Sequence, residues 1–431
     1  MSTNSIWHEV PPLLTAPLPP QTRQRIHTVV IGAGLTGLSA AYHLAQQREV
    51  VVLEAGEIGA GASTRSTGML TPGIAQNLTD LIRRVGAKEA QHLYQQTLHA
   101  IQYVVTLLER EQIDCQLQLN GQLIVAQGKQ GRHRLAAQAQ AFAKLELPCQ
   151  PLDTTGLWQR LRLREIPPGP AHLPAALYLP LAGSLHPGRL VHGLAGAVQI
   201  RGGKIYPHTP VVHIGNQRPA SLSLANGSEV IADQVILATG GYTPQLGLLR
   251  GRILPVQLQA LATEPLATET LAQLGWAGRE CITDSRRLFN YFRLTADHRI
   301  VFGGSWPKYG QTQSALNPAD LVSRLNHTFP ADVALPVAMT WSGIIDYVLD
   351  TLPIITRLQT HPAVIYVGGW CGHGIALSIA AGAWVAHLSE LGTWPANVPQ
   401  FRQKPPLLPT EWARQLGFWA GIRLMSFLDN S

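Results

Sequence analysis

Charged side chains are scarce in this sequence: Lys, Arg, Asp and Glu together make up 14% of the 431 residues, whereas hydrophobic residues make up 45%. This composition excludes a disordered, tail-like chain and a charged coiled coil, and the length predicts two or three compact units. The 33 basic residues exceed the 26 acidic ones, but they are scattered singly and accompany no nucleic-acid-binding motif. We therefore expect a globular protein without a nucleic-acid partner.

Cysteine is also scarce, and the four cysteines form no Cys-x-x-Cys pair. This spacing provides neither a redox dithiol nor a structural metal site, so we expect no bound metal and a reducing, cytoplasmic environment. The N-terminus lacks the charged region and apolar core of a secretory signal. Glycine and proline follow no fixed period, which excludes a collagen-like architecture.

A long uninterrupted apolar run is missing too. Residues 363–388 are the most apolar stretch, but five glycines, two histidines and one serine interrupt them. These interruptions favour a buried helix over a membrane span. Residues 412–428 alternate bulky apolar side chains with Arg414 and Arg423. That segment could lie on a membrane or a partner, but we expect it to pack on the main body.

The first clear pattern is a strand–turn–helix–strand unit. A β-branched run at 28–31 precedes a glycine-containing turn, helical spacing over 35–47 and a second apolar run at 50–53. The turn contains a complete GxGxxG in the strand-to-helix context that makes this motif specific for a dinucleotide. Its candidate phosphate-binding residues are Gly32, Ala33, Gly34, Leu35, Thr36 and Gly37.

An acidic residue closes the second strand of this unit. Glu54, followed by Ala55, lies 22 residues after Gly32, where a carboxylate can accept hydrogen bonds from both ribose hydroxyls. A free 2′-hydroxyl is implied, so we predict FAD or NAD rather than NADP. The helix N-terminus supplies unpaired N–H groups and partial positive charge to the phosphates.

A loop rich in glycine and hydroxyl residues, at 59–68, follows the acidic residue directly and favours FAD. A long cofactor that crosses the sheet needs such a loop, because small residues let the chain approach and hydroxyls satisfy diphosphate and flavin oxygens. Arg65 could face a phosphate or the flavin, the alternative being a surface salt bridge. The candidate cofactor-binding residues are Ala62, Ser63, Arg65, Thr67, Gly68 and Met69.

Two further turns complete the pattern. Residues 238–240 end an apolar strand with small side chains, as expected where a backbone passes beneath the adenine-ribose half of a cofactor. Residues 372–375 lie between a strand and a helix, whose N-terminal N–H groups could stabilise negative charge on a flavin. No second complete GxGxxG exists, so we expect electrons from an organic substrate. The candidate cofactor-binding residues are Ala238, Thr239, Gly240, Gly372, His373, Gly374 and Ile375.

Apolar alternation predicts antiparallel hairpins at 222–237 and 289–302, and the second of them indicates a sheet-based second domain. We expect an α/β fold with a discontinuous Rossmann-like FAD-binding domain and an antiparallel-sheet substrate domain. The predicted boundaries are 1–25 for an extended arm pinned by Trp7, 26–83, 183–245 and 340–392 for the FAD-binding domain, 84–182 and 246–339 for the substrate domain, and 393–431 for a C-terminal segment packed on the body.

Together these features resemble the D-amino-acid oxidase/glycine oxidase family of FAD-dependent oxidoreductases over roughly residues 26–428, and most closely its gamma-glutamylputrescine oxidase branch. The single motifs are weak, but their order and spacing are specific. Further matching segments are Leu185-His186-Pro187, Val211 after Thr209-Pro210, Thr263 to Leu266, Tyr291 to Asp297 and Trp341-Ser342-Gly343. The resemblance assigns Val211 and Gly343 to the cofactor site.

The resemblance implies an enzyme that oxidises the C–N bond of an amine or amino-acid derivative to an imine, with hydride transfer to flavin N5. It also implies oxygen as the electron acceptor and hydrogen peroxide as a product. Two alternatives stay open. One is a dehydrogenase that passes electrons to a quinone or carrier at a membrane, and the other is an FAD-binding assembly protein without turnover.

The sequence departs from the family on the substrate side. Amino-acid oxidases of this family place an arginine shortly after Trp-x-Gly, where it binds the substrate carboxylate, but here the positions are Ile344, Ile345 and Asp346. Simple α-amino acids are therefore disfavoured, and we expect Asp346 to bind a cationic group or to act as a structural hydrogen-bond acceptor. Tyr291 and Arg293 share one face of a strand. Arg293 is expected to contact an anionic part of the substrate or to activate oxygen, or else to be a paired surface arginine.

The last turn departs from the glycine oxidase pattern as well, because this chain has Gly372-His373-Gly374 where that pattern commonly has arginine before Asn-Gly, and in this it resembles the gamma-glutamylputrescine branch. His373 could assist backbone N–H groups at flavin O2, or it could be a core histidine. Cys371 beside it suggests a covalent flavin link, but the covalent cysteine of the family does not fall at this position, so we expect noncovalent FAD. The predicted catalytic residues are Arg293, Tyr291, His373 and Asp346.

Overall fold

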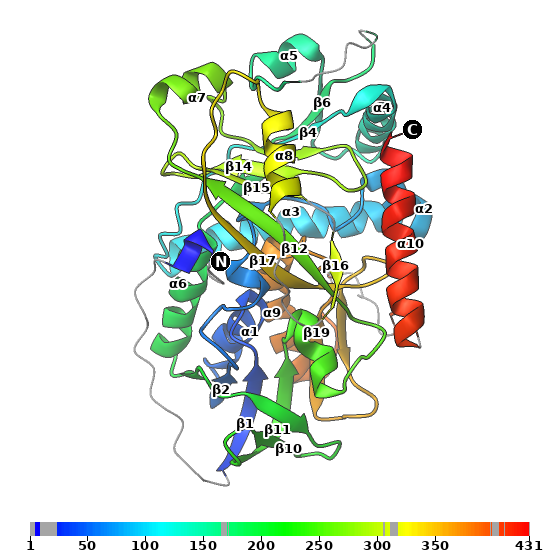
Figure 1. Cartoon of the computed structure of the whole chain (residues 1–431). Helices are drawn as coiled ribbons and strands as arrows, with labels where there is room; N and C mark the ends of the chain where they lie inside the picture. Colours follow the sequence, from blue (N-terminus) through cyan, green and yellow to red (C-terminus); the bar gives the residue numbers. More distant parts are fainter. Residues whose placement is uncertain are drawn as a thin grey trace.

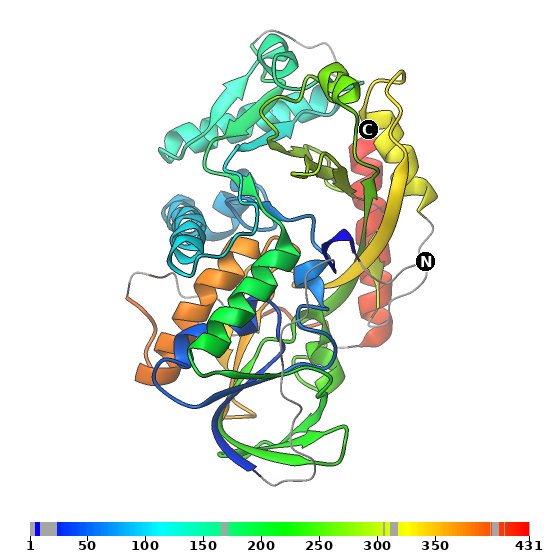
Figure 2. The same cartoon turned by 90° about the vertical axis from the view of Figure 1, so that its left-hand side faces the viewer.

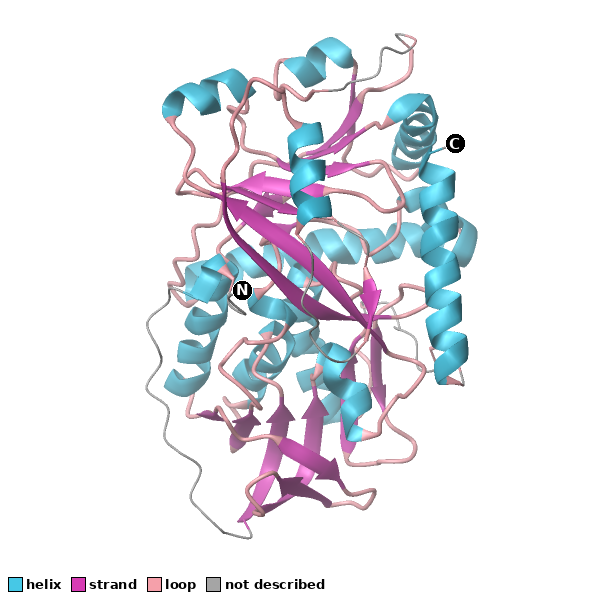
Figure 3. Cartoon of the chain, viewed as in Figure 1, coloured by secondary structure: helices cyan, strands magenta, loops and turns pink. Residues whose placement is uncertain are grey.

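The computed structural model describes residues 5–8, 24–164, 170, 172–304, 307–310, 318–396, 398, 405–408 and 410–430. Two large sheets form the molecule, one in the lower and one in the upper half of Figure 1, with helices around them (Figure 3). The predicted α/β fold with two domains is confirmed. Most of the predicted N-terminal arm, and part of the predicted C-terminal segment, lie outside the described residues.

The first sheet contains the predicted dinucleotide-binding unit at its centre. β1 (Gln24–Ile31) runs parallel to β2 (Val50–Leu53) on one side and to β11 (Glu229–Leu237) on the other. The strand order is β18-β19-β11-β1-β2-β8, with β10 and β9 attached beside β11. The remaining strands are β8 (Lys204–Tyr206), β9 (Val211–Ile214), β10 (Ala220–Leu224), β18 (Ile354–Arg357) and β19 (Val364–Gly368). Because β1, β11 and β19 are mutually parallel, their C-terminal ends meet at one edge, where ligands bind in such sheets.

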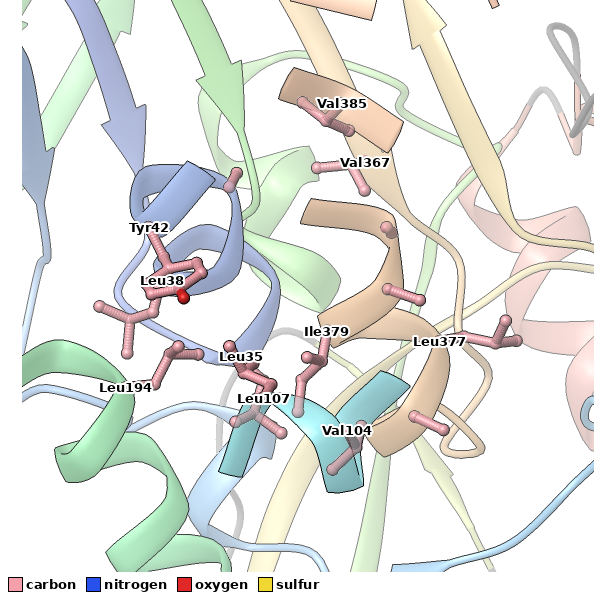
Figure 4. Close-up of a cluster of buried hydrophobic side chains, with 14 of the residues drawn as sticks. Leu35, Leu38, Tyr42, Val104, Leu107, Leu194, Val367, Leu377, Ile379 and Val385 are labelled. Atoms are coloured by element: carbon pink, nitrogen blue, oxygen red, sulfur yellow. The ribbon is translucent and has the colours of Figure 1, made fainter. Parts of the chain in front are cut away.

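Helices cover one face of this sheet and enclose its main core. They are α1 (Leu35–Leu44), α3 (Ala87–Arg110), α6 (Pro187–Ile200) and α9 (Ile375–Leu391). α1 and α9 are packed closely enough for the Ser39 hydroxyl to donate to the carbonyl oxygen of Ile379 at 2.6 Å. Figure 4 shows buried side chains from all four helices in this core: Leu35 and Leu38 from α1, Val104 and Leu107 from α3, Leu194 from α6, and Leu377 and Ile379 from α9.

The long helix α3 corrects the predicted division into domains. The boundary at 83/84 assigns it to the substrate domain, but Ala90, Ile101 and Val104 belong to the core under the first sheet. The boundary itself lies inside α2 (Leu78–Val85). Helical periodicity identifies the apolar stripe of such a helix, but it contains no information about which sheet the stripe will cover.

The second sheet is antiparallel except at one pair, because β4 and β13 run parallel. The two strands come from segments that are separated by a passage through the first domain, which supplies the long crossover that a parallel pair needs.

The strand order of the second sheet is β16-β12-β15-β14-β13-β4-β6-β5, with β17 beside β12, and β14 and β15 form the hairpin predicted at 289–302. The strands are β4 (Gln122–Val125), β5 (Gln150–Leu152), β6 (Ala176–Leu179), β12 (Leu254–Thr263), β13 (Cys281–Asp284), β14 (Tyr291–Leu294), β15 (Ile300–Gly303), β16 (Lys308–Tyr309) and β17 (Val337–Tyr347). The helices of this domain are α4 (Gly128–Lys144), α5 (Thr154–Trp158), α7 (Thr268–Leu274) and α8 (Ala319–Thr328).

Strand β17 connects the two domains. It pairs with β12 from Val337 opposite Thr263 to Tyr347 opposite Leu254. The boundary predicted at 340 therefore lies inside a strand of the second sheet and is corrected to a position after Tyr347. The resemblance assigns Gly343 of this strand to the cofactor site, and that assignment stays a prediction.

The remaining elements are several short ones and one long helix near the end of the chain. The short ones are η1 (Ile6–His8), η2 (Ala62–Thr64), β3 (Met69–Leu70), β7 (Gly183–Ser184) and η3 (Gly240–Leu246), and the long helix is α10 (Glu411–Asn430). α10 is red in Figure 1 and runs along one side of the molecule. Among the described residues, no helix combines the length and the apolarity needed to cross a membrane.

Candidate active site

The turn between β1 and α1 has the close backbone packing that a bound diphosphate requires. Gly32 adopts a φ of +104°, and a Cβ there would lie 2.7 Å from the carbonyl oxygen of Ala238. A Cβ at Gly37 would lie 1.9 Å from the carbonyl oxygen of Gly32, so α1 can pack against its own turn only because residue 37 is glycine. The structure thus gives the first and third glycines of the motif their expected backbone geometry.

Glu54 follows β2 and holds this turn from the side. One carboxylate oxygen accepts the backbone N–H of Ala33 at 2.7 Å, and the other accepts that of Gly56 at 2.9 Å. Each carboxylate oxygen keeps a second acceptor position, so Glu54 can fix the turn and still accept a ribose hydroxyl. β9, which begins at Val211, starts beside this point, because the N–H of Thr209 donates to the backbone oxygen of Glu54 at 2.7 Å.

Two helix N-termini lie at the same edge of the first sheet. α1 begins after Gly34 and α9 begins after Gly374, and neither N-cap provides a side-chain hydrogen bond to its helix. Both helices follow parallel strands, so their N–H groups and positive dipole ends are available on one side of the sheet. This donor set fits the anionic diphosphate and the flavin carbonyl edge of FAD.

The glycine and hydroxyl loop passes over the first of these N-termini. The hydroxyl oxygen of Ser63 accepts the N–H of Leu35 at 3.0 Å, and Ala62 begins the short helix η2. Further along the loop, Gly68 accepts the N–H of Leu185 at 2.9 Å. Met69 then pairs with Ser184 in the β3–β7 ladder. The loop therefore leads from the phosphate end of the site to the region between the two sheets.

Arg65 connects this loop to β17. Its guanidinium donates to the carbonyl oxygen of Ala60 at 2.8 Å and to that of Ser342 at 3.0 Å. A Cβ at Gly343 would lie 2.8 Å from the Arg65 Cβ, so the loop and β17 meet closely at these two predicted residues. Burial lowers the pKa of Arg65. Arg65 is half-buried between the two domains.

Asp346 holds the turn between β19 and α9. Its carboxylate oxygens accept the N–H of Gly369 at 2.6 Å and that of Trp370 at 3.2 Å. Burial raises its pKa to about 6. The preceding residue, Ile345, lies beside Gly372 instead, as expected for alternate residues of a strand. This geometry favours the structural acceptor among the two predicted roles of Asp346, because both oxygens are directed at the turn.

His373 lies at the end of the same turn and faces the segment after β3. Its Nε2 is 3.2 Å from the hydroxyl of Thr71 and 3.1 Å from the carbonyl oxygen of Pro72. A carbonyl only accepts, so Nε2 carries the proton, and burial lowers the pKa of His373 toward the neutral form. The Cys371 thiol is buried, accepts the N–H of Val348 at 3.2 Å and has a raised pKa because of burial.

Arg293 lies in the interior between the two domains. It is 4% exposed, and its guanidinium donates to the carbonyl oxygen of Thr67 and, at 2.7 Å, to that of Leu185. Burial lowers its pKa to about 10, so it remains cationic at neutral pH. The alternative of a paired surface arginine is wrong. Tyr291 lies two residues earlier on the same strand face, and burial raises its pKa to about 12.

Sequence analysis did not identify two polar residues of the second sheet, Gln122 and Thr283. Tyr291 pairs with Thr283 on β13, and the side-chain amide of Gln122 on β4 donates to the Thr283 hydroxyl at 3.1 Å. Strand alternation places all three on the sheet face from which Arg293 reaches the first domain. No signal in the sequence joins Gln122 to Thr283, because only the pairing of β4 with β13 brings them together.

The remaining predicted cofactor residues lie along the same edge of the first sheet. The N–H of Ala238 donates to the carbonyl oxygen of Ile31 at 2.9 Å, which places the end of β11 beside the glycine turn. Thr239 is the N-cap residue of η3, which begins at Gly240. The Thr239 hydroxyl lies 2.8 Å from that of Thr243. The structure therefore brings the predicted turns together, although they are separated by up to several hundred residues.

Comparison with known proteins agrees with this arrangement. Residues 27–388 match the family described as FAD dependent oxidoreductase. Gamma-glutamylputrescine oxidoreductase of Escherichia coli (strain K12) is 32% identical over 83% of this chain and 82% of that protein. The "probable oxidoreductase OrdL" of Haemophilus influenzae is 30% identical over 95% of this chain and 94% of that protein. The crystal structure of glycine oxidase from Geobacillus kaustophilus has a TM-score of 0.69 and 22% identity, covering 85% of this chain and 95% of that chain. The resemblance inferred from the motifs is confirmed, and the chain belongs to the family of FAD dependent oxidoreductases that act on amines or amino acids.

Proposed function

We propose that this enzyme oxidises the C–N bond of an amine that carries a neutral polar group to an imine, with oxygen as the electron acceptor and hydrogen peroxide as a product. One observation carries the proposal. The glycine turn, Glu54, the loop through Arg65 and the turn at His373 form one continuous track along the edge of the first sheet. Arg293, which shares a strand face with Tyr291, contacts the loop of this track at the carbonyl oxygen of Thr67.

The residues of the track bind and orient the cofactor. Backbone N–H groups of α1 would hold the diphosphate, and Glu54 would accept the ribose hydroxyls. The N-terminal N–H groups of α9 would donate to the flavin carbonyl edge, and His373, whose Nε2–H is held by the Pro72 carbonyl, would orient the turn that carries them. FAD bound in this track supplies the acceptor for a hydride from the amine carbon. Noncovalent binding is supported by Cys371, whose buried, protonated thiol is a poor nucleophile.

The strand positions where the family binds the carboxylate of a small amino acid carry no positive charge in this chain. Ile344 and Ile345 replace the carboxylate-binding arginine of the family, and Ile344 is fully buried. The side chains of Gln122, Thr283 and Tyr291 instead offer neutral donors and acceptors. These three side chains can form hydrogen bonds with an amide group of a substrate. One similar protein is named for gamma-glutamylputrescine, an amine that carries an amide. We therefore infer an amide-bearing amine rather than glycine as the substrate class.

The function is tested with the purified holoenzyme. Under anaerobic conditions, gamma-glutamylputrescine should bleach the yellow flavin, and admission of oxygen should restore the colour and release peroxide. Putrescine, sarcosine and glycine serve as comparison amines. Reoxidation by oxygen that is much slower than reoxidation by a quinone would replace the oxidase assignment with a dehydrogenase. Absence of bleaching by every amine would overturn the enzymatic proposal.

The substrate class is tested by Gln122→Met, which keeps the size of the side chain and removes its hydrogen bonds. We expect KM for an amide-bearing amine to rise by about tenfold or more, because a buried polar group of the substrate loses its partner. Gln130→Met, on the exposed side of α4, is the matched control. An unchanged KM in Gln122→Met would show that Gln122 does not take part in recognising the substrate. A cytoplasmic location of the enzyme stays a prediction.

A further inference from the structure

The C-terminal helix α10 presents an apolar stripe to the solvent. Its members are Trp412, Leu416, Trp419, Leu424 and Phe427, and each is more than half exposed, from 56% for Trp419 to 69% for Phe427. Successive members lie three to five positions apart, so they follow one side of the helix along its length. A contiguous exposed apolar patch of about 300 Å² is in the range of the largest patch on a typical monomer, and such a patch is often functional.

The opposite side of α10 fixes this orientation. The Asp429 carboxylate accepts the N–H groups of Arg287 and Leu288, at 2.9 and 3.0 Å. The ring of Phe418 lies 6.0 Å from that of Tyr309 on β16. Contacts near the middle and the C-terminal end of the helix therefore attach it to the second domain, and the apolar stripe faces outward as a consequence.

The charge on the stripe has one sign. Arg423 lies within it, with its guanidinium carbon 4.1 Å from the ring centroid of Trp419. Residues 412–428 contain no acidic residue. The two acidic side chains of α10 are engaged elsewhere, Glu411 with Arg414 and Asp429 with Arg287. The stripe therefore complements a surface that is apolar below and anionic above, the arrangement of a phospholipid headgroup layer.

The size of the stripe disfavours a protein partner. A helix of 20 residues is about 30 Å long and roughly 10 Å wide, which gives a footprint of roughly 300 Å². A stable protein pair buries about 800 Å² on each partner. A membrane imposes no such minimum, because an interfacial helix inserts its own apolar side chains one by one, and Trp is enriched at that depth.

We propose that α10 lies in the headgroup layer of a membrane that contains anionic phospholipids, with its apolar stripe inserted and Arg423 at the level of the phosphates. The attachment is peripheral, since the other side of the helix remains packed on the second domain. The inference does not rest on the proposed function. It concerns a surface that holds none of the residues assigned to the cofactor or the substrate.

The test is flotation of the full-length holoenzyme with vesicles of phosphatidylcholine alone or mixed with phosphatidylglycerol. We compare the wild type with Trp412→Ser/Leu416→Ser/Trp419→Ser. The matched control is Trp158→Ser/Leu181→Ser/Ile200→Ser, because these three residues are also at least half exposed but lie elsewhere. FAD content and the unfolding midpoint of each variant show whether it is folded.

We expect the wild type and the control to float with the mixed vesicles, and the bound fraction of the α10 variant to fall by roughly fivefold or more. Arg423→Glu should weaken binding to the mixed vesicles in particular. Wild-type protein that stays unbound, or an α10 variant that binds equally well, would overturn the proposal. So would a wild-type dimer that the α10 variant dissociates in the absence of vesicle binding, since a second copy would then be the partner.

A second measurement uses the folded wild type, so the test does not depend only on the folding of the variants. Vesicles with brominated acyl chains should quench part of the tryptophan fluorescence. Trp412→Phe/Trp419→Phe keeps the stripe apolar and should still bind, but with most of that quenching lost. Quenching that is equal in both proteins would show that other tryptophans meet the membrane and would overturn the assignment to α10.

Discussion

The indole Nε1 of Trp7 donates a hydrogen bond to the carbonyl oxygen of Ser66 at 2.8 Å. Trp7 is 3% exposed, and its ring lies 4.9 Å from that of His186 and 5.1 Å from the Arg293 guanidinium. Trp7 therefore supports the glycine and hydroxyl loop at 59–68 from the side of the second sheet. The expectation that Trp7 pins the N-terminal arm agrees with these contacts of residues 5–8.

Trp7→Ala should destabilise the protein by about 3–5 kcal/mol, because it removes a large buried side chain and leaves the Ser66 carbonyl without its partner. The measurement is denaturant unfolding of the holoenzyme. Trp158→Ala is the control and should change stability by no more than about 0.5 kcal/mol, since Trp158 is 58% exposed. Equal effects of the two substitutions would show that Trp7 does not hold the loop.

Glu54→Gln should weaken FAD binding by about tenfold or more. An amide has one acceptor oxygen, so it cannot satisfy Ala33 and Gly56 together, and a charge-assisted hydrogen bond is lost. The dissociation constant is measured by titrating the apoprotein with FAD and following flavin fluorescence. Glu57→Gln is the matched control, because Glu57 is exposed and pairs with His208. An unchanged constant in Glu54→Gln would contradict the assigned role.

Gly37→Ala should destabilise the protein by about 3 kcal/mol or more, because the added Cβ meets the carbonyl oxygen of Gly32 at 1.9 Å and the backbone has to move. Gly196→Ala in α6 should have the opposite sign and stabilise by about 0.5–1 kcal/mol, since its Cβ meets no atom within 4 Å and alanine favours a helix. Thermal unfolding of both variants checks the pair. A mild effect at residue 37 would mean that the glycine turn is not tightly packed.

The raised pKa of Asp346 predicts a pH dependence of stability. Its folded pKa of about 6 exceeds the ordinary aspartate value of 3.8, so the folded state binds the proton more tightly than the unfolded state. The resulting stabilisation is fully present below pH 3.8 and is lost as the pH rises through about 6. The stability of Asp346→Asn relative to wild type should therefore rise across this window. A difference that is constant with pH would show that the carboxyl does not titrate there.

Arg293→Lys separates a structural role from a substrate role. A lysine ammonium cannot span the carbonyl oxygens of Thr67 and Leu185, so we expect a loss of about 1–3 kcal/mol in stability. With FAD at saturation, KM for the amine should change little. A large rise in KM at unchanged stability would instead support the predicted contact between Arg293 and an anionic part of the substrate.

The parts of the site that sequence analysis identified are local in the chain. The glycine turn and Glu54 belong to one strand–helix–strand unit, where residue spacing alone determines geometry. Arg293 was misjudged in one of its alternatives because its partners, Thr67 and Leu185, lie 226 and 108 residues away. The contact of Gln122 with Thr283, and the packing of α3 under the first sheet, likewise depend on long-range pairing that no periodicity reveals.

Strand β17 has a mechanical consequence. At one end it pairs with β12 in the second sheet, and at the other the Asp346 carboxylate accepts the N–H of Gly369 in the turn between β19 and α9. A strand that is hydrogen-bonded along its whole length is stiff, so the second sheet and the turn before α9 cannot hinge apart here without breaking the ladder. The separation of these two parts of the molecule is thereby fixed by continuous backbone rather than by side-chain contacts alone.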